Sequence, residues 1–438
     1  MFKNSRVILA IIFFILDAVL LLAYSQKFSV LFLFFILNIL LFFIIKKDKP
    51  LVFLSFLIGV AVAVFFYDYW ITYYGNSYFI GKKSDDWQYD ILWTEGFIER
   101  YGINLFKISE HLNNLERNLG ILHNSQGYVA IVVVFRWFGS FLDGYHTFLP
   151  RIFNIFILTL TAYYSSLIAF YYSKNKQIKT TTFIVVFFFP VMLFNSVHVF
   201  RDTLVSFILV IIYYLLLVNK KSIINILVVL FLLFVLYYNR TSTFFVMVLM
   251  ILILYANPKK INLKLTLSLA FFAIISLFFL DGFISTLTRQ LTTYGVLNTE
   301  RFGNIGSKIF ALPLYVGFIP RIIYLIFTPV PNFSGFHQLY QSIAAFTQIL
   351  FFPYLFVAFK NKGIDIKLKI MFLVFFLGVA FSTATFRHVM MYLPFGIIIT
   401  VLSYYKIKNK DIKLKNYLGY LILLFLLFIF SIFLALIY

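Results

Sequence analysis

The residues with the clearest capacity for chemistry lie in one short polar segment, which reads Gly81-Lys-Lys-Ser-Asp-Asp-Trp-Gln-Tyr-Asp90. Ser84 or Asp85 can cap a helix that begins here. On that helix Asp86 and Asp90 are one turn apart and share a face. A carboxylate in this setting can act as a general base or hold a divalent cation such as Mg²⁺ or Mn²⁺. We therefore take Asp85 and Asp86 as candidate catalytic residues and candidate metal ligands, the alternative being a solvated, capped helix with acids in its first turn.

A second set of candidates consists of polar and charged residues near the ends of apolar segments. Arginine binds phosphate through a bidentate fork that lysine cannot form. The candidates for binding a phosphorylated substrate are Asp90, His123, Arg151, Arg201, Arg240, Arg301, Arg387 and His388. The alternative for each arginine is a structural role, and the adjacent Arg201 and Asp202 can simply neutralise each other. His388 can titrate near neutral pH, although a lone histidine is more often a hydrogen-bonded structural residue.

The composition indicates the class of protein that must position these residues. Hydrophobic residues make up 62% of the chain and charged residues 12%, against roughly 25% charged in soluble domains. Apolar stretches long enough to cross a hydrocarbon core recur along most of the chain. The sequence therefore predicts an all-α, polytopic membrane protein. It contains no cysteine, which excludes disulfides and thiol chemistry.

Hydropathy predicts 13 transmembrane helices and one transmembrane domain over 1–438. The spans fall near 7–24, 28–45, 51–70, 152–172, 180–198, 202–218, 223–238, 241–256, 265–281, 339–359, 369–385, 389–405 and 417–437. Segments 128–142 and 309–327 are apolar but ambiguous, and we expect them to lie in the interface or to re-enter the membrane. The first large outer loop is then 71–151, with a juxtamembrane helix near 97–119, and the second is 282–338, with a candidate re-entrant segment.

The loop charges orient the chain and exclude nucleic acid as the reason for the net charge of +21. With the N-terminus in the cytoplasm, 21 of the 26 lysines lie in inner loops, as the positive-inside rule requires. Only one of the 11 arginines, Arg6, lies on that side. An outer face that is rich in arginine and poor in lysine predicts a site there for a phosphorylated, lipid-linked substrate. The expected location is the cytoplasmic membrane of a bacterium.

Several common catalytic motifs are missing from the sequence. It contains no phosphate-binding loop, no dinucleotide fingerprint, no zinc-protease helix and no nucleophile elbow. Nucleotide-driven pumping is therefore not expected.

The order of the polar motifs resembles the GT-C superfamily of membrane glycosyltransferases. The resemblance rests on the acidic segment after an early span, His123-Asn-Ser-Gln-Gly-Tyr128, Arg151-Ile-Phe-Asn154, and Arg387-His388 ahead of Tyr392-Leu-Pro394. It implies a GT-C-like fold and transfer of a sugar from a polyprenyl-phosphate-linked donor to a glycan or lipid acceptor outside the cytoplasm. It further implies Asp85 or Asp86 as the base, and Arg201, Arg240 or Arg387 as ligands of the lipid phosphate.

The chain also resembles the O-antigen and exopolysaccharide repeat-unit polymerases. That resemblance rests on Arg201-Asp202, followed by a span, a Lys-rich inner loop and the polar turn Asn239-Arg240-Thr241. Two non-enzymatic alternatives are a lipid-glycan flippase or transporter and a structural subunit of an assembly complex. A transporter needs charge along the membrane centre, where only Asp17 clearly lies.

Overall fold

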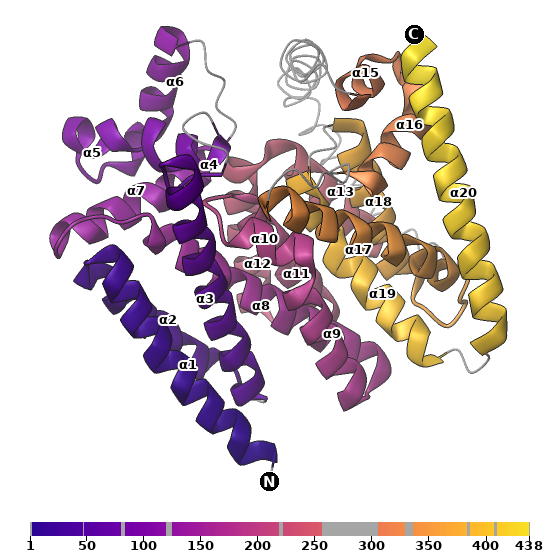
Figure 1. Ribbon diagram of the computed structural model, residues 1–438, viewed down its shortest axis with the longest axis horizontal. Coiled ribbons are helices and arrows are strands. Elements are labelled where there is room, and N and C mark those ends of the chain that lie inside the picture. Colours follow the sequence, from indigo (N-terminus) through magenta and orange to yellow (C-terminus); the bar gives the residue numbers. More distant parts are fainter. Residues whose placement is uncertain are drawn as a thin grey trace. The chain divides into compact units, whose positions relative to one another are not determined.

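The computed structural model describes residues 2–46, 48–79, 84–119, 125–218, 222–255, 305–328, 336–382, 386–406 and 410–437. Within these ranges the protein consists of helices and has no strand (Figure 1). The prediction of an all-α protein is therefore confirmed for this part of the chain.

The chain forms two compact units. The first contains residues 1–167, 183–188 and 192–241, and the second contains residues 168–182, 189–191 and 242–438. The helices that belong wholly to the first unit are α1 (Phe2–Ser25), α2 (Phe28–Ile44), α3 (Lys49–Tyr74), α4 (Asp85–Trp87), the π-helix η1 (Gln88–Leu92), α5 (Glu95–Tyr101), the 3-10 helix η2 (Leu105–Lys107), α6 (Ile108–Leu119), α7 (Gln126–Phe141), α11 (Asp202–Val218) and α12 (Ile223–Asn239). Residues of α8 (Phe148–Ser173), α9 (Lys176–Phe188) and α10 (Pro190–Ser196) are divided between the units. The described helices of the second unit are α13 (Thr241–Tyr255, from its second residue), α15 (Ile305–Ala311), α16 (Leu314–Phe327), α17 (Phe336–Phe359), α18 (Ile366–Ser382), the 3-10 helix η3 (Phe386–Met391), α19 (Leu393–Lys406) and α20 (Lys410–Ile437).

Five of the described helices are long and apolar enough to cross a membrane. They are Val7–Ser25 of α1, all of α3, all of α8, Gln338–Phe359 of α17 and Asn416–Ile437 of α20. The bent pair α9 and α10 is a sixth if it forms one span. Shorter apolar helices coincide with most of the other predicted spans, and the count of 13 stays a prediction. The predicted span 265–281 lies outside the described residues.

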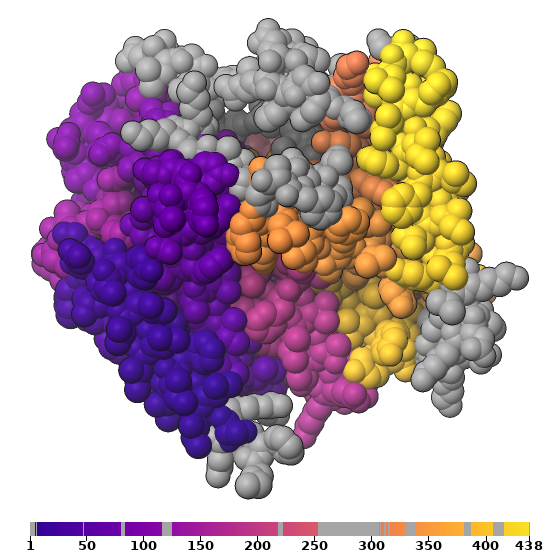
Figure 2. All heavy atoms as spheres, in the orientation of Figure 1, coloured from indigo at the N-terminus to yellow at the C-terminus, as the bar shows by residue number. Residues whose placement is uncertain are grey.

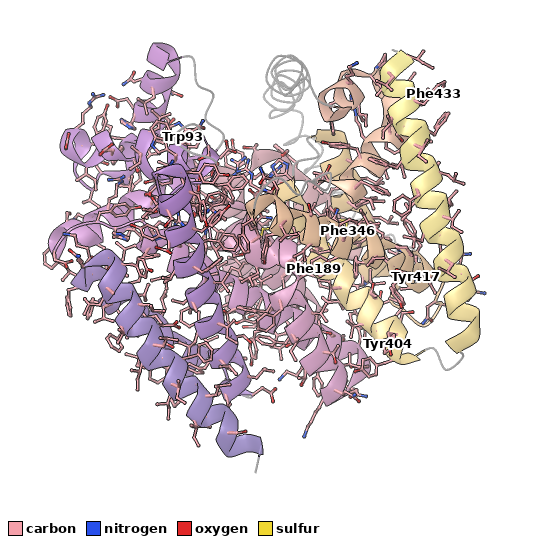
Figure 3. All side chains as sticks on the ribbon, viewed as in Figure 1. Trp93, Phe189, Phe346, Tyr404, Tyr417 and Phe433 are labelled. Atoms are coloured by element: carbon pink, nitrogen blue, oxygen red, sulfur yellow. The ribbon has the colours of Figure 1, made fainter. Side chains whose placement is uncertain are left out.

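The helices long enough to cross a membrane differ in how much of their surface is buried. In α8, 83% of the most apolar window is buried, whereas the figure is 11% for α1 and 17% for α20. The exposed side of α1 is a nearly unbroken row of Val, Ile and Leu side chains, which contribute to one continuous surface with α2 (indigo in Figure 2). On α20, Phe433 is 58% exposed and points away from the helix bundle (Figure 3). Apolar surface of this extent is compatible with lipid rather than water as the neighbour.

The predicted span 180–198 is not one straight helix. It breaks between α9 and α10, whose axes differ by 53°. The cause is Pro190, which lacks an amide hydrogen and whose ring clashes with the preceding helical turn. Phe189 accordingly adopts an extended ψ of 122°.

The juxtamembrane helix predicted near 97–119 is also interrupted. Gly102 ends α5 with a φ of +60°, and the chain passes through η2 before α6 begins at Ile108. A positive φ at this position is accessible to glycine without steric cost. Two shorter helices can therefore lie at different angles where one was expected.

The two ambiguous segments differ from each other. The first is a continuous helix, α7. The second divides at Leu312 and Pro313 into α15 and α16, and Arg321 of α16 donates from Nη2 to the carbonyl oxygens of Phe310 and Leu312 at 2.8 and 3.0 Å. Because these carbonyls lack helical partners at the end of α15, the guanidinium supplies the bonds that the break removes.

The packing of α3 against α8 and α9 depends on Gly59. A Cβ atom at this position would lie 2.6 Å from Cγ2 of Ile155 and 3.0 Å from Cζ of Phe187. The absence of a side chain therefore sets how closely α3 approaches its neighbours in the first unit.

We expect Gly59→Ala to lower the free energy of unfolding by about 1–3 kcal/mol, because the added methyl group overpacks this contact. The measurement is thermal unfolding of the purified protein in detergent micelles. The matched control is Gly378→Ala in α18, where a Cβ would meet no atom within 4 Å. Equal unfolding temperatures for the two variants would contradict the proposed role of Gly59.

Candidate active site in the first long loop

Asp86 is the organising residue of the acidic segment. It is fully buried at the start of α4. Its Oδ2 accepts a bond from the amide of Phe79 at 2.9 Å, and its Oδ1 accepts from the amide of Trp87 at 3.0 Å and from Oγ of Ser84 at 2.5 Å. One carboxylate therefore binds both Phe79 and Ser84, which are separated in the sequence. The expectation that the side chain of Ser84 caps the helix is wrong, because its hydroxyl binds Asp86 and makes no capping bond to the backbone.

Asp85 has a different environment from its neighbour. Its side chain is partly exposed, whereas Asp86 is enclosed by protein donors. A substrate hydroxyl can approach a partly exposed carboxylate. The structure thus separates the two candidates into an accessible acid and one that orders the loop.

Asp90 is held by two tyrosines in the π-helix η1. Its Oδ2 accepts from Oη of Tyr78 at 2.8 Å, and its Oδ1 accepts from Oη of Tyr145. Burial, together with the negative charge of Asp90, raises the pKa of both phenols above their ordinary value, so both remain donors at neutral pH. The carboxylate therefore already has protein partners on each oxygen, which favours a structural role over direct substrate binding.

Arg136 fixes the backbone of the same π-helix to α7. Its Nε donates to the carbonyl oxygen of Asp90 at 3.1 Å and to Oγ1 of Thr94 at 2.8 Å, while its Nη2 also donates to the Asp90 carbonyl. Its Cζ lies 4.3 Å from the ring centre of Tyr145. A π-turn displaces carbonyl groups from regular helical bonding, and such turns are frequent at functional sites. The Asp90 carbonyl that Arg136 binds belongs to this turn, and Oγ1 of Thr94 also donates to it. Trp93, which follows η1, is labelled in Figure 3.

Arg151, in the first turn of α8, is the most unusual side chain of the site. It is fully buried, and its Nη2 donates to the carbonyl oxygen of Ser77. Its Nε and Nη1 have no hydrogen-bond partner among the described residues. Its Cζ lies 5.7 Å from the ring centre of Tyr67. A buried guanidinium with unused donors is costly unless an anion approaches it.

The charge of Arg151 acts on the acidic segment and on a nearby histidine. Burial raises the pKa of Asp86 to about 6, and Arg151 opposes that rise. Burial and the same guanidinium lower the pKa of His146 to about 4. At neutral pH the site therefore combines a permanent cation, a largely ionised buried acid and a neutral imidazole.

Beside this cluster lies a buried polar network centred on His198. Its Nε2 accepts a bond from Nε1 of Trp70 at 2.9 Å, so its Nδ1 carries the proton and donates to the carbonyl oxygen of Phe194 at 2.7 Å. Nδ2 of Asn154 donates to the carbonyl oxygen of His198 at 2.7 Å and to Oη of Tyr128 at 2.9 Å. These bonds connect α3, α7, α8 and the turn before α11, which gives the site a rigid base.

A second charged cluster joins the turns that precede α11 and α13. Nη1 of Arg240 lies 3.0 Å from Oδ1 of Asp202, and both side chains are buried. Nη1 of Arg201 donates to the carbonyl oxygen of Asn239 at 3.2 Å. Asp202 therefore pairs with an arginine that lies 38 residues away in the sequence.

The remaining predicted site residues are distributed as follows. Arg387, partly exposed, and His388, buried, lie on η3 in the second unit. His123 and Arg301 lie outside the described residues. Sequence reasoning missed Trp70, Tyr78, Tyr145, His146 and His198 as parts of the site. Neither their types nor their spacing indicates it, because these residues come from four separate segments of the chain.

The metal predicted at Asp85 and Asp86 does not fit the donor set. Over the described ranges, no group of three or more His, Asp or Glu side chains could hold a metal ion. Both oxygens of Asp86 already accept bonds from backbone amides, whereas a divalent cation needs them as ligands. We therefore assign no metal-dependent step to this pair.

The raised pKa of Asp86 predicts a specific pH dependence of stability. Because the folded value of about 6 lies above the ordinary 3.8, the native protein binds this proton more tightly than the unfolded chain does. The free energy of unfolding should therefore increase as the pH falls from about 6 to about 4, and Asp86→Asn should remove that increase. Thermal unfolding across this range measures it, with the exposed Glu95→Gln as control. Identical pH profiles for Asp86→Asn and the unsubstituted protein would refute the assignment.

Comparison with family models, with curated proteins and with solved structures gave no match. We therefore infer function from the geometry and chemistry of this chain alone.

Proposed function

We propose that the protein is an integral-membrane glycosyltransferase. It transfers a sugar from a polyprenyl-phosphate-linked donor to a glycan or glycolipid acceptor at the non-cytoplasmic face of a bacterial membrane, in the assembly of a surface polysaccharide or glycolipid. The observation that carries the proposal is the buried Arg151, which acts on the acidic segment and has two donor nitrogens without a partner among the residues that the structure describes. A lipid-linked phosphate supplies the anion that this guanidinium lacks.

The proposed reaction needs a base and a stabilised leaving group. The oxygen of an acceptor hydroxyl attacks the anomeric carbon, and the bond from that carbon to the phosphate oxygen breaks. The hydroxyl proton passes to a carboxylate, and the phosphate leaves with the bonding electron pair. Asp85 is the better placed base because it is partly exposed.

Asp86 and Arg151 assist the base and the leaving group. Asp86 holds the loop that presents Asp85, and Arg151 stabilises the charge that develops on the departing phosphate. A cation that is already buried and oriented needs little rearrangement during the reaction, which makes its contribution to rate larger than that of a solvated one.

The same chemistry is compatible with a repeat-unit polymerase. The specific observation in its favour is that the turns carrying Arg201-Asp202 and Asn239-Arg240 contact each other through the Asp202–Arg240 ion pair. A polymerase binds two lipid-linked glycans and so needs a second anion-binding region. Both candidates release a polyprenyl phosphate or diphosphate, and product length distinguishes them.

Substitutions at the acidic segment and at Arg151 test the proposal. In proteoliposomes supplied with polyprenyl-phosphate-linked sugars, Asp85→Asn should reduce transfer by roughly 10²- to 10⁴-fold while leaving lipid binding intact. Arg151→Gln should weaken the preference for polyprenyl phosphate over uncharged polyprenol by roughly 10- to 100-fold, as expected for loss of a charge-assisted bond.

The matched control is Arg100→Gln, which removes an exposed arginine from the same loop. It should change neither measurement. Full transfer by the Asp85→Asn, Asp86→Asn double variant would eliminate the proposed base. Equal binding of the charged and uncharged lipids by the unsubstituted protein would eliminate the phosphate site.

A further inference from the structure

The turn between α1 and α2 is attached to the loop that follows α7 by four hydrogen bonds. The carboxylate of Asp143 accepts bonds from the amides of Phe28 and Ser29, the second at 2.9 Å. Nζ of Lys27 donates to the carbonyl oxygen of Asp143 at 2.7 Å, and Oγ of Ser29 donates to that of Gly144 at 2.8 Å. The N-cap residue of α2 is Lys27, which makes no side-chain capping bond, so Asp143 caps α2 from a distant part of the chain.

The backbone around Asp143 is tightly folded. Gly144 has a φ of +116°, and a Cβ there would lie 3.0 Å from Nζ of Lys27. The Gly144 amide donates to the carbonyl oxygen of Gly139 at 2.8 Å, which folds the loop back on the end of α7. A Cβ on Gly139 would in turn lie 2.7 Å from Cα of Tyr145. The loop therefore has little freedom to move independently of α2 and α7.

The next residues of this loop are parts of the candidate active site. Oη of Tyr145 donates to Asp90, and its ring lies against Arg136. Nε2 of His146 lies 3.2 Å from Oη of Tyr67, whose ring Arg151 faces. The four consecutive residues 143 to 146 thus link the start of α2 to Asp90 and to Tyr67.

We propose that the α1–α2 turn is a positioning element of the candidate active site, in which Asp143 holds Tyr145 on Asp90 and so orients the acidic segment. The catalytic consequence rests on the proposed glycosyl transfer, but the mechanical linkage does not. Lys27 is one of only five lysines outside the predicted inner loops. It belongs to this linkage and not to the charge pattern that orients the chain.

Hydrogen exchange of the full-length protein in lipid nanodiscs tests the linkage without any substrate. Asp143→Ala should speed exchange by roughly five- to tenfold, the size expected for a lost cap, both in residues 26–30 and in residues 84–94. Asp143→Asn keeps one of the two acceptor oxygens and should give an intermediate effect. Tyr145→Phe should affect residues 84–94 alone.

The matched control is Asp365→Ala, which removes a carboxylate that caps α18 by accepting from the amide of Lys367 at 2.7 Å. It should leave both segments unchanged. Faster exchange confined to residues 26–30 in Asp143→Ala would overturn the proposal, because the disturbance would then stop at α2.

Transfer assays separate this proposal from the proposed function. If Asp85→Asn is inactive, Asp143→Ala should lower turnover while leaving the affinity for polyprenyl phosphate unchanged, with partial recovery in Asp143→Asn. Unchanged turnover in that setting would overturn the positioning role. If Asp85→Asn keeps full activity, the proposed transfer mechanism fails, and the exchange pattern alone decides whether the linkage exists.

Discussion

The candidate site depends on the burial of one charge, the guanidinium of Arg151. Among the described residues its one acceptor is the carbonyl oxygen of Ser77, and its exposed fraction is zero. Transfer of an unpaired cation from water into protein has a large desolvation cost, which nearby dipoles, aromatic rings or carboxylates must offset. Here the guanidinium lies over the ring of Tyr67, and it interacts electrostatically with the carboxylate of Asp86. The proposed affinity for phosphate follows from placing that charge inside the protein, and the same charge adds to burial in lowering the pKa of His146.

A second recurring feature is the use of cations to bind carbonyl groups at irregular points of helices. Arg136 does so at η1, and Arg321 does so at the end of α15. Lys369 donates from Nζ to the carbonyl oxygens of Phe359 and Asn361 at 2.7 and 2.8 Å, where α17 ends. In apolar surroundings a carbonyl without a donor is costly, so every break in a helix needs a replacement donor. Arg136, Arg321 and Lys369 therefore stabilise irregular turns and helix ends.

Within the described ranges, the sequence predicted the elements better than the contacts. Most predicted spans coincide with helices, since an apolar run in α-helical form is what hydropathy detects. The sequence singled out the acidic segment as the centre of the candidate site, but it could not assign different roles to its acids. Asp85 and Asp86 are adjacent and identical in type, and the fold distinguishes them by burying Asp86 against donors such as the amide of Phe79. Arg201 and Asp202 also look like a local pair in the sequence, whereas Asp202 pairs with Arg240 in the structure.

What the sequence determined by itself was the class of protein and the inventory of groups available for chemistry. Composition and hydropathy are properties of each segment alone, so they survive without knowledge of tertiary contacts. The tertiary structure decided which groups meet: Tyr145 with Asp90, Asp143 with the start of α2, and Arg151 with the acidic segment. At the second of these contacts the backbone approaches closely, since a Cβ on Gly144 would lie 3.0 Å from Nζ of Lys27. A pattern of residue types carries no such information, because side chains far apart in the chain meet only after the helices have packed.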